Sequence, residues 1–351
     1  MKILVLALSG IGDALMFTPA LELTKQHFPQ AEIDALVMFK GVEDIYKRIP
    51  RFNKVMYFDF MKEGAFNSLK YVLKLRGKYD YSVNAYPSNR KEYNIIQFLI
   101  GAAERAGIEY LRGNKANFGF LNTVHLKEND MLHNVDENIL LMKKMLKFTS
   151  DEKPGLIFPL TTNDINTADT YLQEMGLTGT APIIGFHPGC ATLKNHINRR
   201  WEPGKFASLA SKLIAQTGAK ILLFGGPEEE ELKQLIHSGV NSANCLLTKQ
   251  RNLGESAALI AKCDVFVTND SSLMHAASAM KRKVVAIIGP TNTTYIHPWK
   301  TDYKIVSLHL ECSPCFFYSP KPLLCKREDV RFKCIKELDV DMVFNAVQEF
   351  L

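Results

Sequence analysis

Short apolar runs alternate with segments of helical apolar spacing along the chain, most clearly within residues 263–294. There the run Val265-Phe266-Val267 ends at a polar turn, residues 268–272, and apolar residues at helical spacing follow from 273 to 280. A second apolar run, residues 284–288, ends in Gly289-Pro290-Thr291. The pattern predicts strand, turn, helix, strand and turn, with both turns on one edge of a parallel sheet.

The same alternation occupies both halves of the chain. Strand-like runs lie at residues 2–8, 33–38, 55–58 and 79–85, and again at 182–186 and 219–224. Between the two sets, Lys153-Pro154-Gly155 opens a stretch without periodicity, and a chain of 351 residues suits two domains. We therefore expect an α/β fold with an N-terminal domain, residues 1–155, and a C-terminal domain, residues 156–351. The pattern leaves open whether the terminal helix packs back on the N-terminal domain.

The first turn of the chain holds the first candidate for chemistry. Ser9-Gly10-Ile11-Gly12-Asp13 follows the first strand and resembles the start of a dinucleotide fingerprint, but Leu15 stands where a third small residue is expected. No acidic residue ends the second strand at Met38-Phe39-Lys40, which argues against a dinucleotide-dependent oxidoreductase. The turn places Asp13 at the mouth of the sheet, where it is either a functional carboxylate or a helix cap.

The turns of the second half suit a phosphate. Helix N-termini, backbone N–H groups and hydroxyls meet at the two turns of residues 263–294, as a nucleotide diphosphate requires. The alternative is an ordinary βα unit with well-capped helices. In the first half, the polar and basic residues 86–91 follow a strand end and are candidates for an acceptor pocket, with Arg112 as a weaker one.

The net charge of +6 lies mostly in the first half. Residues 1–150 hold 21 Lys and Arg against 16 Asp and Glu, whereas residues 151–351 hold 22 against 21. This excess suits an anionic partner such as a phosphorylated lipid, a membrane surface or nucleic acid. The basic amphipathic helix expected at residues 66–78 fits a membrane surface, although a solvated crossover helix is favoured. No apolar run approaches the ~20 residues of a membrane span, and we expect a cytoplasmic protein.

Four cysteines in a proline-containing loop form the pattern C-x₂-C-x₉-C-x₈-C: Cys312, Cys315, Cys325 and Cys334. Their spacing is compatible with a structural zinc, but reduced thiols are favoured for a cytoplasmic chain. The D-x-D match at Asp339-Val340-Asp341 precedes an apolar-periodic helix. It is therefore interpreted as a helix N-cap and not as a metal site.

Several motifs together resemble the ADP-heptose:lipopolysaccharide heptosyltransferases, glycosyltransferase family 9. In chain order they are S-G-I-G-D-A-L-x-x-T-P-A-L, H-P-G with R-R-W, F-G-G-P, and N-D-S-S-x-x-H-A-A-S-A with I-I-G-P-T. The resemblance covers nearly the whole chain. It implies the GT-B architecture, in which two facing Rossmann-like domains enclose a cleft, the C-terminal one holding the donor and the N-terminal one the acceptor.

Carried over residue by residue, the resemblance makes Asp13 the catalytic base. The donor-binding candidates are Thr192, Lys194, Arg199, Glu228, Arg251, Asp270, Ser271, Ser272 and His275. The acceptor-binding candidates are Gly12, Arg90, Lys91 and Arg112. Ser272 replaces the commoner Gly of the donor motif and Arg199 replaces a Lys seen in some members, which puts the identity of the donor sugar in doubt more than the reaction type.

The implied activity is inverting transfer of a heptose from ADP-L-glycero-D-manno-heptose to a lipopolysaccharide inner-core acceptor. Helix N-termini with Lys194 and Arg199 can neutralise the leaving diphosphate without a metal ion, and no cofactor is expected. The implied partners are the nucleotide sugar and an anionic glycolipid, with peripheral contact at the cytoplasmic face of the inner membrane and no nucleic acid. Two alternatives remain open: a family 9 transferase using another nucleotide sugar, and a non-catalytic nucleotide-sugar-binding protein.

Overall fold

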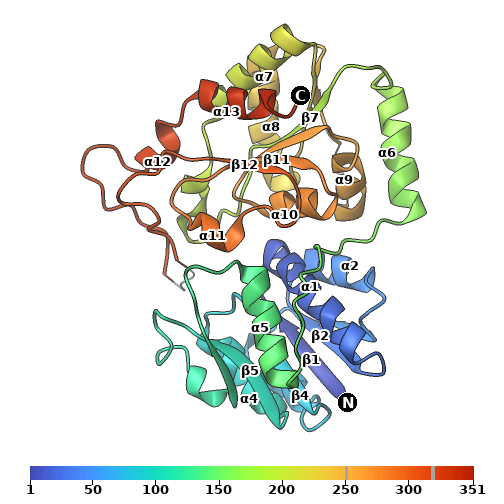
Figure 1. Ribbon diagram of the computed structural model, residues 1–351, viewed down its shortest axis with the longest axis vertical. Coiled ribbons are helices and arrows are strands. Elements are labelled where there is room, and N and C mark those ends of the chain that lie inside the picture. Colours follow the sequence, from blue (N-terminus) through green and yellow to red (C-terminus); the bar gives the residue numbers. More distant parts are fainter. Residues whose placement is uncertain (250–251, 318–320) are drawn as a thin grey trace. The chain divides into compact units, whose positions relative to one another are not determined.

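The computed structural model describes residues 1–249, 252–317 and 321–351. Its contacts divide the chain into two compact units, Met1–Pro159 and Leu160–Phe317 with Lys321–Leu351. Each unit contains one six-stranded parallel sheet with helices on both faces (Figure 1). The expected α/β class with two Rossmann-like units is confirmed, and every strand run that the sequence predicted is present.

The sheet of the first unit has the order β3-β2-β1-β4-β5-β6. Its strands are β1 (Lys2–Ala7), β2 (Glu32–Val37), β3 (Lys54–Tyr57), β4 (Tyr81–Asn84), β5 (Glu104–Glu109) and β6 (Val124–Lys127). Its helices are α1 (Ile11–His27), α2 (Lys40–Lys47), α3 (Gly64–Leu73), α4 (Lys91–Ile100), α5 (Asn134–Leu146) and the 3₁₀ turn η1 (Gly119–Leu121).

The sheet of the second unit repeats this order as β9-β8-β7-β10-β11-β12. Its strands are β7 (Ile183–His187), β8 (Lys220–Leu223), β9 (Cys245–Leu247), β10 (Val265–Asn269), β11 (Lys283–Ile287) and β12 (Tyr303–Val306). Its helices are α6 (Thr162–Glu174), α7 (Pro203–Thr217), α8 (Glu230–Val240), α9 (Leu253–Ile260), α10 (Ser272–Ala279), α11 (Thr293–Ile296), α12 (Lys333–Lys336) and α13 (Val340–Gln348), with the 3₁₀ turns η2 (Leu193–Arg199) and η3 (Pro227–Glu229).

The central strands are buried on both faces because helices cover both sides of each sheet. All five residues of β10 and of β7 are buried, as a parallel sheet requires. In the second unit, α7 packs against α8 and α13, and α9 packs against α6 and α10. The terminal helix α13 thus packs on α7, β11 and β12 of its own unit.

Helix ends follow local chemistry. α7 begins with Pro203, whose missing N–H would have no partner there, and ends at Gly218, where φ is +67°. The expected basic helix begins at Gly64 and ends at Leu73, and Val72 is its one buried residue. Among the described residues, no helix is long and apolar enough to cross a membrane.

Candidate functional site

The strand order places a switch point in each sheet. In the second unit β7 lies between β8 and β10, and the chain proceeds outward in opposite directions on its two sides. Loops leaving the carboxyl ends of such neighbours diverge and form a crevice in which ligands of open α/β sheets bind. The residues at these strand ends are His187, the last residue of β7, Asp270 and Ser271 after β10, and Thr291 after β11.

At this edge of the sheet, the carboxylate of Asp270 contacts side chains from two other loops. Its Oδ2 forms a buried ion pair with Nη1 of Arg199 and accepts a hydrogen bond from Oγ1 of Thr291 at 2.7 Å. The side chains of Asp270 and Arg199 are each only 10% exposed. The guanidinium of Arg199 also lies over the ring of Phe316, 5.5 Å from its centroid. The structure therefore brings together two of the predicted donor residues and holds the cation in a fixed place.

The N-terminus of α10 directly follows this pair. Ser271 is its N-cap residue, yet its side chain makes no hydrogen bond to the first turn of the helix. His275, one turn along, is 4% exposed, and its Nδ1 is buried without a hydrogen-bond partner among the described residues. Burial lowers the pKa of His275 to about 4 against the opposing charge of Asp270, so this ring is neutral. An unpaired polar atom so close to a helix N-terminus is typical of a ligand site.

The loop after β7 carries the other cationic candidate. Lys194 and Asn195 have φ values of 56° and 62°, in the left-handed region that side chains rarely adopt. The backbone N–H of Leu323 donates to the Lys194 carbonyl at 2.9 Å, which anchors the loop. Thr192 is exposed at the start of η2. Backbone strain held by a distant contact is common at functional loops.

Two further donor candidates are Glu228 and Arg251. Glu228 lies exposed on η3, whereas its neighbour Glu229 turns inward, with Oε2 3.2 Å from Nε2 of His187. Burial raises the pKa of Glu229, but the hydrogen bond and charge of His187, the Gly226 N–H and the charge of Arg200 together lower it overall. Neither Glu229 nor His187 is among the residues predicted for the site, and only the H-P-G and F-G-G-P motifs indicate their loops. Arg251 lies outside the described residues.

The switch point of the first unit lies between β1 and β4. Ser9 Oγ donates to the Pro87 carbonyl at 2.6 Å, which joins the loops that follow these two strands. Asp13 lies in the first turn of α1, next to Gly12, and its Oδ2 accepts the Gly10 N–H at 3.2 Å. The carboxylate thus occupies the carboxyl edge of the sheet, as predicted, and also satisfies a backbone donor at the helix start.

The remaining acceptor candidates surround the same edge. Arg90 is the N-cap of α4 and Lys91 its first residue, and the Asn89 amide donates to the Arg112 carbonyl at 3.4 Å. Arg112 forms two hydrogen bonds to Asp130, at 3.1 and 2.7 Å, in an exposed ion pair. The predicted acceptor residues therefore lie on two loops that contact each other.

Charges at this edge also affect the tyrosines beneath it. Burial, with a contribution from Asp13 and against Arg90, raises the pKa of Tyr93 to about 12. Its hydroxyl therefore stays protonated and donates to the Leu8 carbonyl at 2.7 Å, which fastens α4 to the end of β1.

Within residues 1–249, 252–317 and 321–351, no cluster of three or more His, Cys, Asp or Glu side chains is arranged to hold a metal ion. The cysteines 312, 315, 325 and 334 are free thiols. Burial and then the other three cysteines raise the pKa of Cys334 to about 11. The Asp339 carboxylate accepts the Asp341 N–H at 2.9 Å, so the predicted N-cap of α13 is confirmed.

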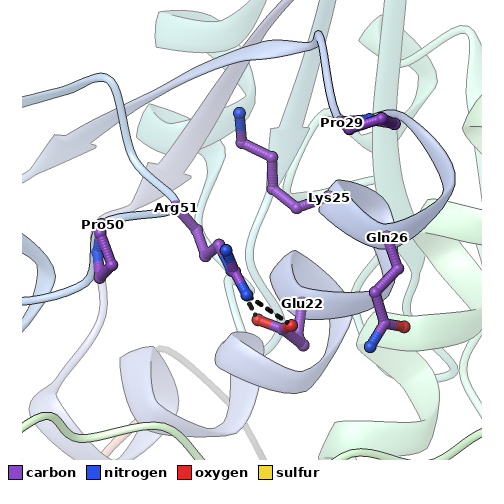
Figure 2. A pocket seen from close by; sticks show the side chains of 6 residues that line it. All are labelled: Glu22, Lys25, Gln26, Pro29, Pro50 and Arg51. Carbon is purple, nitrogen blue, oxygen red and sulfur yellow. Dashed lines mark hydrogen bonds and ion pairs between the residues drawn. The ribbon is translucent and has the colours of Figure 1, made fainter.

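A surface pocket of the first unit is lined by six residues, none of which is a predicted site residue: Glu22, Lys25, Gln26, Pro29, Pro50 and Arg51 (Figure 2). Its volume is about 190 Å³, below the usual ligand-site range of roughly 300–1,000 Å³. Arg51 makes hydrogen bonds of 2.9 and 3.0 Å to Glu22, and Lys25 donates to the Ala31 carbonyl at 2.6 Å. Its charged groups are thus already paired within the protein.

Comparison with known proteins shows the same architecture and sequence family. The family model described as glycosyltransferase family 9 (heptosyltransferase) matches residues 71–323. Lipooligosaccharide heptosyltransferase 2 of Haemophilus influenzae is 30% identical over 319 residues, which cover 88% of this chain and 89% of the relative. The solved structure of E. coli ADP-heptose lps heptosyltransferase II superposes with a TM-score of 0.76 at 22% identity, covering 100% of this chain and 98% of the other. E. coli heptosyltransferase WaaC with ADP superposes with a TM-score of 0.70 at 18% identity, covering 100% of both chains.

Proposed function

The chain belongs to glycosyltransferase family 9, the heptosyltransferases, and on that basis we propose that it transfers a heptose from ADP-L-glycero-D-manno-heptose to a lipopolysaccharide inner-core acceptor. The observation that carries the proposal is the edge formed by β7, β10 and β11, where Asp270, Arg199 and the start of α10 meet. This edge offers a cation held by Asp270 and a helix N-terminus whose N-cap side chain makes no hydrogen bond to the first turn, and both suit a nucleotide diphosphate.

The donor is proposed to be an ADP-sugar because relatives are named for ADP-heptose and one solved relative holds ADP. The neutral, buried His275 and the loop around Glu228 lie on the unit that would hold it. Ser271 and Ser272 place their backbone N–H groups at the N-terminus of α10, where a phosphate gains from the helix dipole. Arg251 completes the proposed donor set from outside the described residues.

Departure of ADP is proposed to need no metal ion. Negative charge that develops on the diphosphate as the glycosidic oxygen leaves is stabilised by the guanidinium of Arg199, the ammonium of Lys194 and the N-terminus of α10. Arg199 is already oriented by Asp270, so little reorganisation accompanies the charge transfer. Thr192 and Lys194 belong to one loop, which can close over the diphosphate.

Asp13 is proposed as the general base. As the acceptor oxygen bonds to the anomeric carbon, its proton passes to the Asp13 carboxylate and the bond from that carbon to the ADP oxygen breaks. Attack opposite the leaving group inverts the anomeric centre. The position of Asp13 at the switch point of the first unit, held by the Gly10 N–H, supports this role. Gly12, which has no side chain, leaves room beside it.

The acceptor is proposed to be an anionic glycolipid bound by Arg90, Lys91 and Arg112. Arg90 and Lys91 open α4, and their side chains carry two positive charges at one loop. Arg112 is paired with Asp130 in an exposed position, and such a pair is easily exchanged for a phosphate or carboxylate of a ligand because exposed ion pairs are worth only ~0–1 kcal/mol.

Peripheral membrane contact is proposed to run through the α3 surface, defined as Met61, Lys62, Phe66, Leu69, Lys70, Leu73 and Lys74. Phe66 is 79% exposed and Met61 66%. Phe66, Leu69 and Leu73 share one helix face by their spacing, and Lys70 and Lys74 lie beside them. Exposed apolar side chains with adjacent lysines are the composition of helices that lie in the interface of an anionic bilayer.

Binding and transfer assays test the proposal together. ADP should raise the melting temperature of the protein more than UDP or GDP at equal concentration, because ligand binding stabilises the folded state by mass action. With ADP-heptose and an inner-core acceptor, mass spectrometry should detect acceptor enlarged by one heptose. A larger shift with UDP would favour a family 9 transferase for another nucleotide sugar. Binding of ADP-heptose without transfer to any acceptor would favour a non-catalytic binding protein.

A further inference from the structure

Ser271 is an N-cap residue that does not cap its helix. Its backbone conformation, φ −151° and ψ 168°, is extended, as an N-cap requires, but its side chain makes no hydrogen bond to the first turn of α10. Instead, its Oγ lies 2.9 Å from Nδ1 of His187 and 3.0 Å from Oγ1 of Thr268. The hydroxyl that would ordinarily satisfy a helix N–H is thus held by a neighbouring strand.

The other nitrogen of His187 is fixed by a carboxylate. Nε2 lies 3.2 Å from Oε2 of Glu229. The same carboxylate accepts the Gly226 N–H at 3.0 Å and lies 3.5 Å from Nη2 of Arg200. A Cβ at Gly189 would stand 1.6 Å from Oε1 of Glu229, so only glycine permits this approach. The carboxylate is therefore held in place on several sides.

These contacts restrict the possible hydrogen-bond directions. A carboxylate only accepts, so Nε2 of His187 carries the proton toward Glu229, and in the tautomer protonated at Nε2 alone Nδ1 accepts from Ser271. Thr268 Oγ1 donates its own proton to the Asn269 carbonyl at 2.8 Å, so toward Ser271 it can only accept. The Ser271 hydroxyl therefore donates its single proton either to Nδ1 of His187 or to Oγ1 of Thr268, and both acceptors belong to this network.

We infer that His187 and Glu229 are positioning residues that hold the Ser271 hydroxyl away from α10 and so keep its first-turn N–H groups open for the donor diphosphate. This inference rests on the proposed function of that helix N-terminus. Ser271 would then serve the diphosphate through its backbone, while its side chain is restrained by His187. A capping hydroxyl would compete with the phosphate for the same N–H groups.

Two replacements of His187 separate the roles of its nitrogens. His187→Gln places an amide N–H near the position of Nε2, which preserves the contact with Glu229 but removes the acceptor for Ser271. His187→Asn places its amide oxygen near the position of Nδ1, which preserves the acceptor. Released Ser271 in His187→Gln should cap α10 and weaken ADP binding about fivefold, equivalent to ~1 kcal/mol, the usual contribution of a cap. His187→Asn should bind ADP more tightly than His187→Gln does.

Amide hydrogen exchange provides a readout that is independent of ADP. In ligand-free His187→Gln, the N–H groups of Leu273 and Met274 should exchange more slowly than in the wild type, because the freed hydroxyl now covers them. Adding Ser271→Ala to His187→Gln should remove this protection and recover ADP affinity toward that of Ser271→Ala alone. Melting temperatures measured on all variants verify that each is folded.

The outcomes are distinct. Unchanged exchange at Leu273 and Met274 in a folded His187→Gln, or equal ADP affinity of the Gln and Asn variants, would overturn the positioning inference. No relief of the His187→Gln defect by Ser271→Ala would overturn it as well. If exchange changes as expected but the wild type does not bind ADP, the positioning inference stands and the proposed function fails.

Discussion

Arg199 and Asp270 form a buried ion pair at the carboxyl edge of the second sheet, and Thr291 donates to the same carboxylate at 2.7 Å. The pair joins the loop after β7 to the turn after β10. The proposed function gives Arg199 two roles: it neutralises Asp270 within the protein, and it stabilises the negative charge of the donor diphosphate.

Replacing Arg199 by an uncharged residue should lower both the stability of the protein and its affinity for ADP. Among the described residues, Arg199→Met leaves the buried Asp270 carboxylate with the hydrogen bond from Thr291 but without its cation, and loss of one member of a buried pair costs ~3–5 kcal/mol. We expect the free energy of unfolding in urea to fall by about that amount and ADP affinity to fall as well. The matched control is Arg199→Lys, which keeps the charge and should lose less of both. Full stability and affinity in Arg199→Met would contradict the role given to this pair.

The raised pKa of Glu137 predicts that the free energy of unfolding depends on pH. Burial is the main cause that raises its pKa to about 7, with help from Glu128, and its Oε2 has no partner among the described residues. Between the ordinary value of 4.5 and about 7 the folded protein binds more protons than the unfolded chain. Its contribution to stability is therefore fully present below pH 4.5 and is lost as pH rises through about 7.

The measurement compares Glu137→Gln with the wild type by urea unfolding at pH 5 and pH 8. The variant should gain about 3 kcal/mol relative to the wild type between these values, since each pKa unit corresponds to ~1.4 kcal/mol. Both proteins share every other titrating group, so the difference isolates Glu137. A pH-independent difference would mean that this carboxyl titrates normally.

How far the sequence predicts the structure depends on the element. β10 and α10 were predicted because Val265-Phe266-Val267 is apolar and β-branched or aromatic, and Ser271 stands at a helix start. β5 and β6 were not predicted, because their sequences Glu-Arg-Ala-Gly-Ile-Glu and Val-His-Leu-Lys contain no apolar run. They are strands because β5 pairs with the edge of β4 and β6 pairs with β5, a tertiary cause that local pattern does not record.

The candidate site likewise contains residues that local sequence predicts and contacts that depend on the tertiary fold. Asp13 and Asp270 were predicted as site residues because each stands in a motif just after a strand, and Arg199 was predicted from the R-R-W motif. The contact between His187 and Glu229 joins residues 42 positions apart and exists because β7 and β8 are neighbours in the sheet. Four consecutive glutamates begin at Glu228, and no local rule tells which one turns inward. In the 3₁₀ turn η3, Glu229 is the residue whose side chain accepts the N–H of the N-cap residue Gly226.

The α3 surface predicts binding to anionic membranes. Replacing Phe66 and Leu69 together by Ser should weaken partitioning to vesicles that contain phosphatidylglycerol by at least tenfold, because burying one large apolar side chain is worth ~1.5–3 kcal/mol. Leu235→Ser removes an exposed leucine from α8 and is the control. Vesicle sedimentation measures both. Equal loss in the control, or none in the double variant, would place the membrane contact elsewhere.

Turnover should persist in excess EDTA if Lys194, Arg199 and the start of α10 stabilise the leaving diphosphate. Initial rates with and without EDTA should agree within about twofold, since these groups supply the charge that a metal would. Loss of activity restored specifically by Mg²⁺ or Mn²⁺ would contradict this. Zinc analysis of the purified protein is the companion measurement, and stoichiometric zinc with unfolding on its removal would show that the four cysteines bind a metal.

The general base is tested by one substitution with a matched control. Asp13 and Asp164 are both third residues of their helices, and both accept a backbone N–H from the N-cap residue, at 3.2 and 2.8 Å. Asp164→Asn should therefore report what a change of capping alone does to stability and rate. Asp13→Asn keeps an acceptor for Gly10 but removes the basic oxygen.

The most direct measurement is the single-turnover rate of Asp13→Asn at saturating ADP-heptose and acceptor, with its melting temperature determined alongside. We expect a folded protein with near-native ADP affinity and a rate lower by roughly 10²–10⁴, the usual contribution of general-base catalysis. Asp164→Asn should retain the wild-type rate. A folded, ADP-binding Asp13→Asn with a normal rate would contradict the mechanism and leave Asp13 as a helix cap.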